Sequence, residues 1–551
     1  MHIRFPVLIF LVWCAAADLS AQQTPAGSPA DRVAHAVDSN SLRAHFEFLA
    51  DDAMEGRRPG TRGAELTAGY LAAQFRRLGL EPAGDSGTFY HQVPIITLTP
   101  KPTLRVLGAT PTELAYRDDY VLWSMRNDAV TTLKAEMVFV GYGIVAPEHN
   151  WNDYHDIDVK NKIVVVLVND PGIRDSTIFR GPILTYYGRW TYKIEEAERQ
   201  GASGILLVHT TESATYPWTT VQSGWTGPQV RIEEPPTSLL VAGWLNTETA
   251  TRLLRQADQD LTRLMDLAAT SQFRAVALPL EVEASIRSDI TRSETSNVLG
   301  RWPGRGPLAR EAVLITGHYD HFGIGTPVDG DSIYNGAEDN ASGTAAVLAA
   351  AESFVRSGVR TGRSIVFVGF TAEESGLLGS EALVAKPTIP LSRTAAILNL
   401  EVMNLYGRTQ DVSALGLDQS SLGPVFRRAA AAERLGVSIN KDALLHGSYF
   451  RSDHFPFARA GVPGTSIQNG ERYVGKPAGY GHEKKAEYTA KRYHQPADEI
   501  LPWFSYDGVL QQLRVIVRTA VAVGNALSQP VWNRTSEFRE AGEERKAGKR
   551  E

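Results

Sequence analysis

Six side chains in the second half of the chain stand just after predicted strands or in loops beside them, and all are imidazoles or carboxylates. They are His318, Asp339, Glu373, Glu374, Glu401 and His494. In an open α/β sheet, functional residues gather beyond the carboxyl ends of the strands, so we expect these groups to lie together. So many acids at one edge would repel one another unless a cation lies among them. The set therefore predicts a metal site.

The chemistry of this site is narrowed by the cysteine content, since Cys14 is the only cysteine. Thiolate ligands and a cysteine nucleophile are thereby excluded, and His with carboxylates suits catalytic zinc. One bridging carboxylate could hold two metals roughly 3.5–4 Å apart, which lowers the pKa of a bridging water. A carboxylate that is not a ligand must then move the proton to the leaving amine. In the pair Glu373–Glu374, one residue can bind metal and the other can act as this base.

Taken singly, these groups have simpler interpretations. A lone His318 is more often structural than a ligand, and the acids Glu373 and Glu374 suit the start of a helix. Asp339 alone would be an ordinary helix cap. Glu401 is harder to dismiss, because it directly follows an apolar strand and a buried carboxylate needs a partner or a metal. The joint occurrence favours the metal site.

The elements that must position these residues alternate between strands and helices from Ser296 onward. Apolar strands are expected over 312–316, 364–370, 395–400, 411–415 and 465–467. Helices are expected over 342–357, 376–385, 422–434 and 506–526. This alternation predicts an α/β fold whose mixed, mainly parallel sheet is covered by helices on both faces.

Residues 101–290 have a different texture, with short β-rich runs and a helical run over 190–200. We interpret them as a compact β-rich insert, and the polar stretch 281–296 as part of its return connection.

Composition excludes other classes of function. The 56 Lys and Arg against 62 Asp and Glu give a net charge of −6, which offers no electrostatic case for nucleic acid or an anionic membrane as partner.

The N-terminus carries the pattern of a secretory signal peptide. An apolar run over 5–17 follows Arg4, and small residues lead to Ala21. The run is too short to span a bilayer, and a buried first helix or a retained anchor is the alternative. We expect a secreted or periplasmic protein with no transmembrane segment in the mature chain.

Several strings carry a resemblance to a known family. In chain order they are GHYDHFG, YNGAEDNASG, FTAEESGLLGS, NLEVMN, YFRSDHFPFARAGVP and YHQPADE. Together they resemble metallopeptidase family 28, the co-catalytic zinc aminopeptidases and their glutamate carboxypeptidase relatives. The region 101–290 resembles a protease-associated domain, and the segment that begins at Leu49 resembles the N-terminal part of the same family.

The resemblance implies two Zn²⁺ ions, with Asp339 bridging, on the ligands His318, Asp339, Glu374, Glu401 and His494. It implies Glu373 as the general base and Asp320 as the residue that orients His318. Tyr493 would steady the tetrahedral intermediate, or only pack. Family members usually carry Asp where this chain has Glu401, which offers the same donor group on a longer arm.

The expected function is a di-zinc exopeptidase, foremost an aminopeptidase that cleaves N-terminal residues from peptide substrates through a metal-bridging hydroxide. The alternatives are a zinc carboxypeptidase or dipeptidase-type hydrolase acting on N-blocked substrates, and a non-catalytic binding protein on the same scaffold. Arg57, Arg58 and Arg62 could meet a substrate carboxylate, but we favour the interpretation that they face solvent; His321 receives no role. The expected divisions are a signal peptide (1–21), a tether (22–35), an N-terminal part of the peptidase domain (36–100), the insert (101–290), the catalytic domain (291–530) and a charged tail (531–551).

Overall fold

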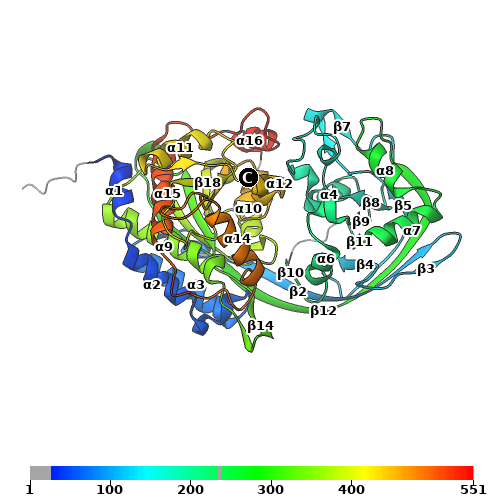
Figure 1. The fold of residues 1–551 in the computed structure, drawn as a ribbon, viewed down its shortest axis with the longest axis horizontal. Helices are drawn as coiled ribbons and strands as arrows, with labels where there is room; N and C mark the ends of the chain where they lie inside the picture. Colours follow the sequence, from blue (N-terminus) through cyan, green and yellow to red (C-terminus); the bar gives the residue numbers. More distant parts are fainter. Residues whose placement is uncertain (1–26, 234–237, 550–551) are drawn as a thin grey trace, which may run out of the picture.

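The computed structural model describes residues 27–233 and 238–549, in two lobes that long strands connect (Figure 1). The predicted signal peptide and Cys14 lie outside the described residues. We use the name site lobe for residues 27–100 and 291–549, and insert lobe for the described residues of 101–290. None of the described helices combines the length and apolarity that crossing a bilayer requires.

The site lobe is built on a twisted sheet. Its strands are β13 (Ala312–His318), β16 (Ser364–Phe370), β17 (Thr394–Leu400), β18 (Asp411–Leu415) and β20 (Gly464–Gln468). β13 lies between β16 and β17 and is parallel to both, β20 is parallel to β17, and β18 runs antiparallel to β20. Every residue of β13, β16 and β17 is buried, as expected for strands covered on both faces. The predicted fold class is confirmed.

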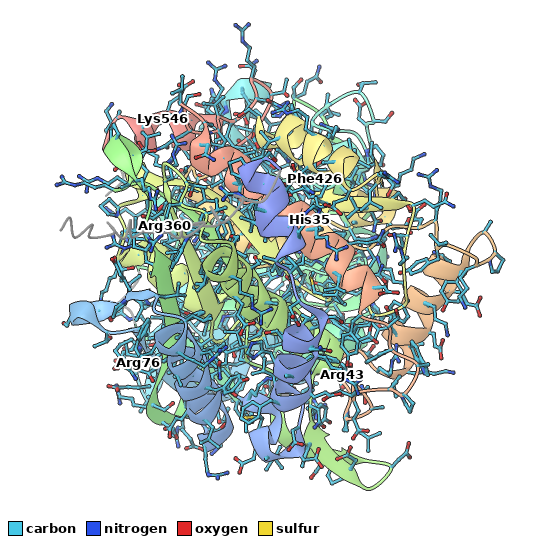
Figure 2. The ribbon with its side chains drawn as sticks, turned by 90° about the vertical axis from the view of Figure 1, so that its left-hand side faces the viewer. His35, Arg43, Arg76, Arg360, Phe426 and Lys546 are labelled. Carbon is cyan, nitrogen blue, oxygen red and sulfur yellow. The ribbon has the colours of Figure 1, made fainter. Side chains whose placement is uncertain are left out.

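Helices cover both faces of this sheet. One face carries α9 (Ser342–Ser357) and α15 (Asp507–Asn525), and against them pack α1 (Pro29–His35), α2 (Ser39–Leu49), α3 (Arg62–Arg77) and α11 (Leu422–Ala432). Figure 2 views this layer, in which His35, Arg43, Arg76 and Phe426 mark α1, α2, α3 and α11. The other face carries α10 (Leu378–Ala385) and α13 (His454–Arg459).

A long two-stranded ribbon joins the lobes. β2 (Tyr90–Leu107) pairs antiparallel with β12 (Val276–Trp302), which continues onto β16 at one end and onto β5 (Val130–Phe139) at the other. The stretch 281–296, interpreted as part of the return connection, runs from the insert lobe back to the site lobe as continuous strand. Its polar residues alternate with buried ones such as Val282 and Ile286, a pattern with the period of a strand that has one exposed face.

The insert lobe continues the same sheet. β5 is followed by β8 (Ile163–Leu167), β9 (Gly204–Val208) and β11 (Val241–Leu245), all parallel, and β4 (Tyr120–Ser124) closes the edge antiparallel. Its helices are α4 (Trp190–Arg199), α5 (Thr211–Ala214), α6 (Trp218–Gly224), α7 (Thr247–Gln256) and α8 (Leu261–Ala268). Tyr186, just before α4, packs on Phe450 and Phe455 of the site lobe at ring distances of 6.2 and 5.3 Å.

Both ends of the described chain are more ordered than the sequence suggested. Residues 29–35 of the predicted tether form α1, and Asp31 forms an ion pair of 2.6 Å with Arg518 of α15. The expected frayed tail contains α16 (Arg539–Lys546), whose Arg545 is fully buried and donates to two carbonyl oxygens of the site lobe. Phe538 is buried, and the apolar surface that one aromatic ring buries helps to keep this charged segment packed on the site lobe.

Candidate metal centre

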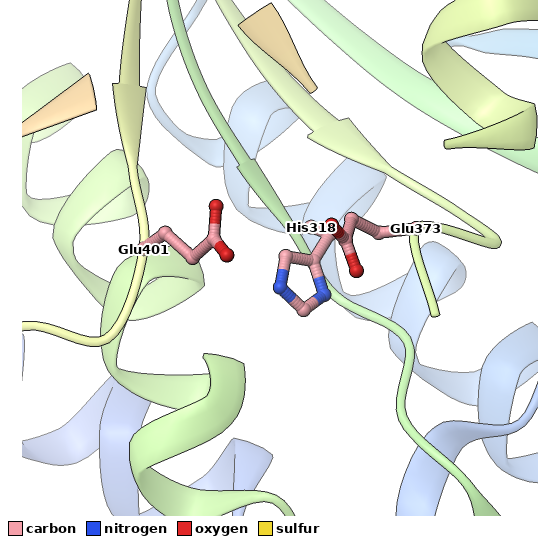
Figure 3. A group of neighbouring side chains, drawn as sticks. All are labelled: His318, Glu373 and Glu401. Carbon is pink, nitrogen blue, oxygen red and sulfur yellow. The ribbon is translucent and has the colours of Figure 1, made fainter. Parts of the chain in front are cut away.

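The predicted site residues come from one edge of the sheet. His318 is the last residue of β13, Glu373 follows β16, and Glu401 follows β17. Because these strands are parallel, their carboxyl ends meet, and Figure 3 shows the imidazole of His318 between the two carboxylates. Asp339 lies in the turn before α9, and His494 follows α14 (Tyr480–Lys491).

Asp339 lies between two imidazoles. Its Oδ1 is 3.4 Å from His318 Nε2, and its Oδ2 is 3.3 Å from His494 Nε2. His494 Nε2 is also 3.3 Å from Glu374 Oε2. One carboxylate thus presents one oxygen to each histidine, which is the arrangement a bridging ligand requires.

Two overlapping groups of ligand atoms lie within 4.8 Å of one another: His318 with Glu373 and Glu401, and His318 with Asp339 and Glu374. The structure therefore brings together all six side chains that the sequence singled out. His318 is 1% exposed, whereas the side chain of His494 is 33% exposed. The centre is thus buried on the strand side and open on the side of His494.

The surroundings of the imidazole nitrogens indicate whether a metal ion would fit the site. His318 Nε2 and His494 Nε2 are buried, point at carboxylates, and have no hydrogen-bond partner among the described residues. An unsatisfied buried nitrogen is costly, and a metal ion would satisfy it. Imidazole and carboxylate donors without thiolate match the preferences of catalytic zinc. The residues present therefore fit a divalent metal.

The pKa shifts of the site residues also favour a bound cation. Burial raises the pKa of Glu373 well above its ordinary range and that of Glu401 to about 7, and in both cases the charge of His318 opposes the shift. Burial lowers the pKa of His494, but the negative charges of Glu374 and Asp339 outweigh burial and raise this pKa to about 10. The site holds more acid than its own cations neutralise.

Asp320 contacts both the imidazole of His318 and the Glu373–Glu374 turn. Its carboxylate accepts from the backbone N–H of Glu373 at 3.0 Å and of Glu374 at 3.4 Å. His318 Nδ1 lies 3.2 Å from the backbone carbonyl of Asp320, and 3.8 Å from its carboxylate. Asp320 thus fixes the Glu373–Glu374 turn with its side chain and the imidazole with its main chain.

His321 is a site residue that sequence analysis missed. It is 1% exposed, and its Nδ1 lies 2.7 Å from Glu374 Oε1. The signal was its place in the same strand-end string as His318, three residues further on. Tyr493, by contrast, is 43% exposed and stacks on the His494 ring at 3.7 Å.

Arg57 is fully buried, so the expectation that it faces solvent was wrong. It donates to the backbone carbonyls of Tyr319, Leu49, Asn335 and Gly336 at 2.6 to 2.9 Å. Tyr319 separates His318 from Asp320, and Gly336 begins the turn of Asp339, so one guanidinium ties two ligand-bearing loops together. Arg58 and Arg62 are exposed as expected.

The string around Arg451 supports the other side of the centre. Ser452 donates a hydrogen bond to Glu401, whose Oε2 also accepts from Asn399 Nδ2 at 3.2 Å. Asp453 is buried and accepts from Ser380 at 2.7 Å. The hydrogen bonds from Ser452 and Asn399 hold the longer arm of Glu401, which points toward His318 in Figure 3.

Comparison with known proteins places this geometry in a family. Residues 297–517 match the model of Peptidase family M28, a range that contains every residue of the centre. This region belongs to peptidase family M28.

Curated relatives of this M28 region match over part of their length. The chain is 27% identical over 241 residues to "Aminopeptidase YwaD" of Bacillus subtilis, which covers 43% of this chain and 50% of that protein. It is 31% identical over 180 residues to "Leupeptin-inactivating enzyme 1" of Streptomyces exfoliatus, covering 32% and 36%. The matched segments thus span half or less of these relatives.

Among solved structures, an aminopeptidase from Aneurinibacillus sp. strain AM-1 aligns over 91% of this chain and 97% of its own, at 17% identity and a TM-score of 0.45. A zinc aminopeptidase from Bacillus subtilis aligns over the same shares, at 19% identity and a TM-score of 0.42.

Proposed function

We propose that the chain is a two-zinc exopeptidase that releases N-terminal residues from peptides. The observation that carries the proposal is Asp339, which presents one oxygen to His318 and the other to His494. Each histidine also has a second carboxylate nearby, Glu401 for the first and Glu374 for the second. The fit of these donors to zinc and the M28 match of the region support it.

In this proposal His318, Asp339 and Glu401 hold one ion, and His494, Asp339 and Glu374 hold the other. Zinc supplies Lewis acidity, which polarises a peptide carbonyl and makes water more acidic. Glu401 stands where the family usually has Asp, and its hydrogen bonds from Ser452 and Asn399 orient it toward His318.

Glu373 moves the proton in this proposal. It is 8% exposed and makes no ion pair with a lysine or arginine among the described residues, so its carboxylate is available as a base. Asp320 holds its backbone N–H, which fixes where the side chain starts. From there Glu373 takes a proton from the attacking water and gives it to the nitrogen of the leaving amine.

The test is Glu373→Gln, which keeps the shape of the side chain and removes the base. We expect two zinc ions per chain to remain, by mass spectrometry of the metal, while kcat falls about a thousandfold. Glu483→Gln, at an exposed position of α14, is the matched control and should behave like the parent. Full hydrolysis by Glu373→Gln with both ions bound would contradict the mechanism.

The direction of cleavage is tested with free and N-blocked peptides. The name of one curated relative, "Aminopeptidase YwaD", supports the aminopeptidase direction. Cleavage confined to N-blocked substrates with a free C-terminus would instead identify a carboxypeptidase. A protein that binds no zinc and hydrolyses no peptide would be a binding protein on this scaffold.

We further propose a secreted or periplasmic location, supported by the apolar run 5–17. The N-terminal residue of protein purified from culture medium or periplasm should lie near Ala21.

We also propose that residues 101–290 are a protease-associated domain inserted between the parts 36–100 and 291–530 of the catalytic domain. Tyr186 packs on Phe455, three residues after the Ser452 that donates to Glu401, and this supports a role for the domain at the substrate cleft.

A further inference from the structure

Two arginines lie on the segments through which the insert lobe packs on the site lobe. Arg189 directly precedes α4, which Figure 1 shows on the side of the insert lobe that faces α12 (Lys441–Leu445). Arg451 follows the short helix Ser448–Phe450. The ring of Tyr186 lies 6.2 Å from that of Phe450, so aromatic packing holds the two arginine-bearing segments against each other.

Neither guanidinium has a counter-charge. Among the described residues, neither Arg189 nor Arg451 makes an ion pair or a side-chain hydrogen bond, and Arg189 Nε is buried without any partner. Burial, and after it the charge of Arg451, lower the pKa of Arg189 to about 9. A buried charge facing a like charge is unfavourable, and an anion between the two would relieve it.

Tyr216 completes the group. It is partly buried in the loop between α5 and α6. Burial raises the pKa of its hydroxyl, and the charges of both Arg189 and Arg451 oppose that shift. Two guanidinium groups and a phenol offer only donors to an anion, and the planar fork of arginine matches a carboxylate.

This group borders the metal centre. Arg451 is adjacent in sequence to Ser452, whose hydroxyl donates to Glu401. Leu377, three residues after Glu374, packs on the apolar cluster that contains Tyr186 and Phe450. If the scissile bond of a peptide lies at Glu373 and Glu401, a group several residues along the same peptide would therefore reach the arginines.

We propose that Arg189, Arg451 and Tyr216 form a subsite for a substrate carboxylate. The carboxylate is either the C-terminus of a short peptide or an acidic side chain. In the first case the subsite measures peptide length, and in the second it selects sequence. The inference deepens the proposed peptidase function and rests on it, but it holds for either direction of cleavage.

The test compares alanine peptides of increasing length, each as the free acid and as the C-terminal amide, with amides that carry one aspartate. We expect the free acid of one length to have a KM about tenfold below that of its amide, the scale of one charge-assisted hydrogen bond. If aspartate restores the low KM to an amide, the subsite selects acidic side chains. If aspartate does not restore the low KM, the subsite binds the C-terminal carboxylate.

The variants Arg451→Gln and Arg189→Gln should abolish this difference by raising the KM for the free acids to the level of the amides. Arg451 is exposed, so its variant separates binding from folding. Arg255→Gln, at an exposed position of α7 far from the contact, should keep the preference. Equal KM values for acids and amides in the parent, or a preference that both arginine variants retain, would overturn the proposal.

If no peptide is hydrolysed at all, the proposed function fails and the subsite is still testable. Calorimetric titration of the protein with alanyl peptides, as acids and as amides, then measures binding directly. Tighter binding of the acids in the parent, and its loss in Arg451→Gln, would support the subsite. Equal binding of acids and amides would overturn it.

Discussion

Two groups of buried charges in this molecule differ in how they are balanced. In the insert lobe, Lys193 is fully buried, the charges of Asp170 and Asp153 act on it, and its ammonium faces the rings of Tyr142 and Tyr192 at 5.8 Å each. The insert lobe thus holds a cation of its own. The metal centre has imidazoles but no lysine or arginine paired with its acids in the described part of the chain.

The difference separates a structural cluster from a functional one. In the insert lobe, Asp153 also accepts from Trp151 Nε1 at 2.8 Å, and Asp170 accepts from Thr185 Oγ1 at 2.6 Å. These carboxylates thus have hydrogen-bond donors and a lysine charge within the chain, although Lys193 Nζ itself has no hydrogen-bond partner among the described residues. The acids around His318 are not balanced in this way, so their balance must come from outside the chain, and a perturbed, unbalanced group marks a functional site.

The largest effect on stability is expected from Lys193→Met. It leaves Asp153 and Asp170 buried without their cation, so unfolding should become easier by about 3 kcal/mol. Thermal melting followed by tryptophan fluorescence measures it, since Trp190 and Trp244 lie in the same lobe. The double variant with Asp153→Asn should recover part of the loss. If the single variant melts like the parent, Lys193 does not balance these acids and the comparison fails.

Arg57→Lys should have the next largest effect. Lysine cannot reach the four carbonyls that the planar guanidinium serves, so we expect a loss of about 2 kcal/mol and weaker zinc binding by equilibrium dialysis. Arg62→Lys is the matched control, because Arg62 is exposed and, within the described part of the chain, its ion pair is with Glu55 alone. Unchanged zinc affinity in Arg57→Lys would show that this residue holds the fold but not the metal centre.

The smallest effect is expected from Glu401→Gln after zinc is removed with a chelator. Removing one acid from an unbalanced group should raise the stability of the metal-free protein by about 1 kcal/mol. With zinc restored, the same variant should bind metal more weakly and lose activity. Glu65→Gln, exposed on α3, should change neither. A metal-free Glu401→Gln that melts below the parent would mean that the acids are balanced within the chain.

Much of the site lobe could be predicted because its elements are apolar throughout. β16, β18 and α9 lie at the predicted residues, since runs buried on both faces stand out from polar loops. β12 was missed because its solvent-facing residues are polar, and its length depends on pairing with β2, far away in sequence.

The metal centre was accessible to sequence analysis through the residues that end strands. Arg57 and His321 were not, because their roles depend on contacts that the chain makes only after folding. Arg57 comes from a loop rich in glycine and arginine, which resembles a solvent-exposed turn, yet all its partners but Leu49 lie more than two hundred residues away. Arg189 was missed for the same reason, since Arg451 belongs to the other lobe.

The ribbon of β2 and β12 limits how this protein could be re-engineered. β12 runs from β5 of the insert lobe to β16 of the site lobe without a loop. Successive residues of a strand face opposite sides, so adding or deleting one residue would reverse every side chain beyond it. An exchange of the insert lobe for that of another protein would therefore have to preserve the strand register in steps of two residues, unlike a cassette joined through flexible linkers.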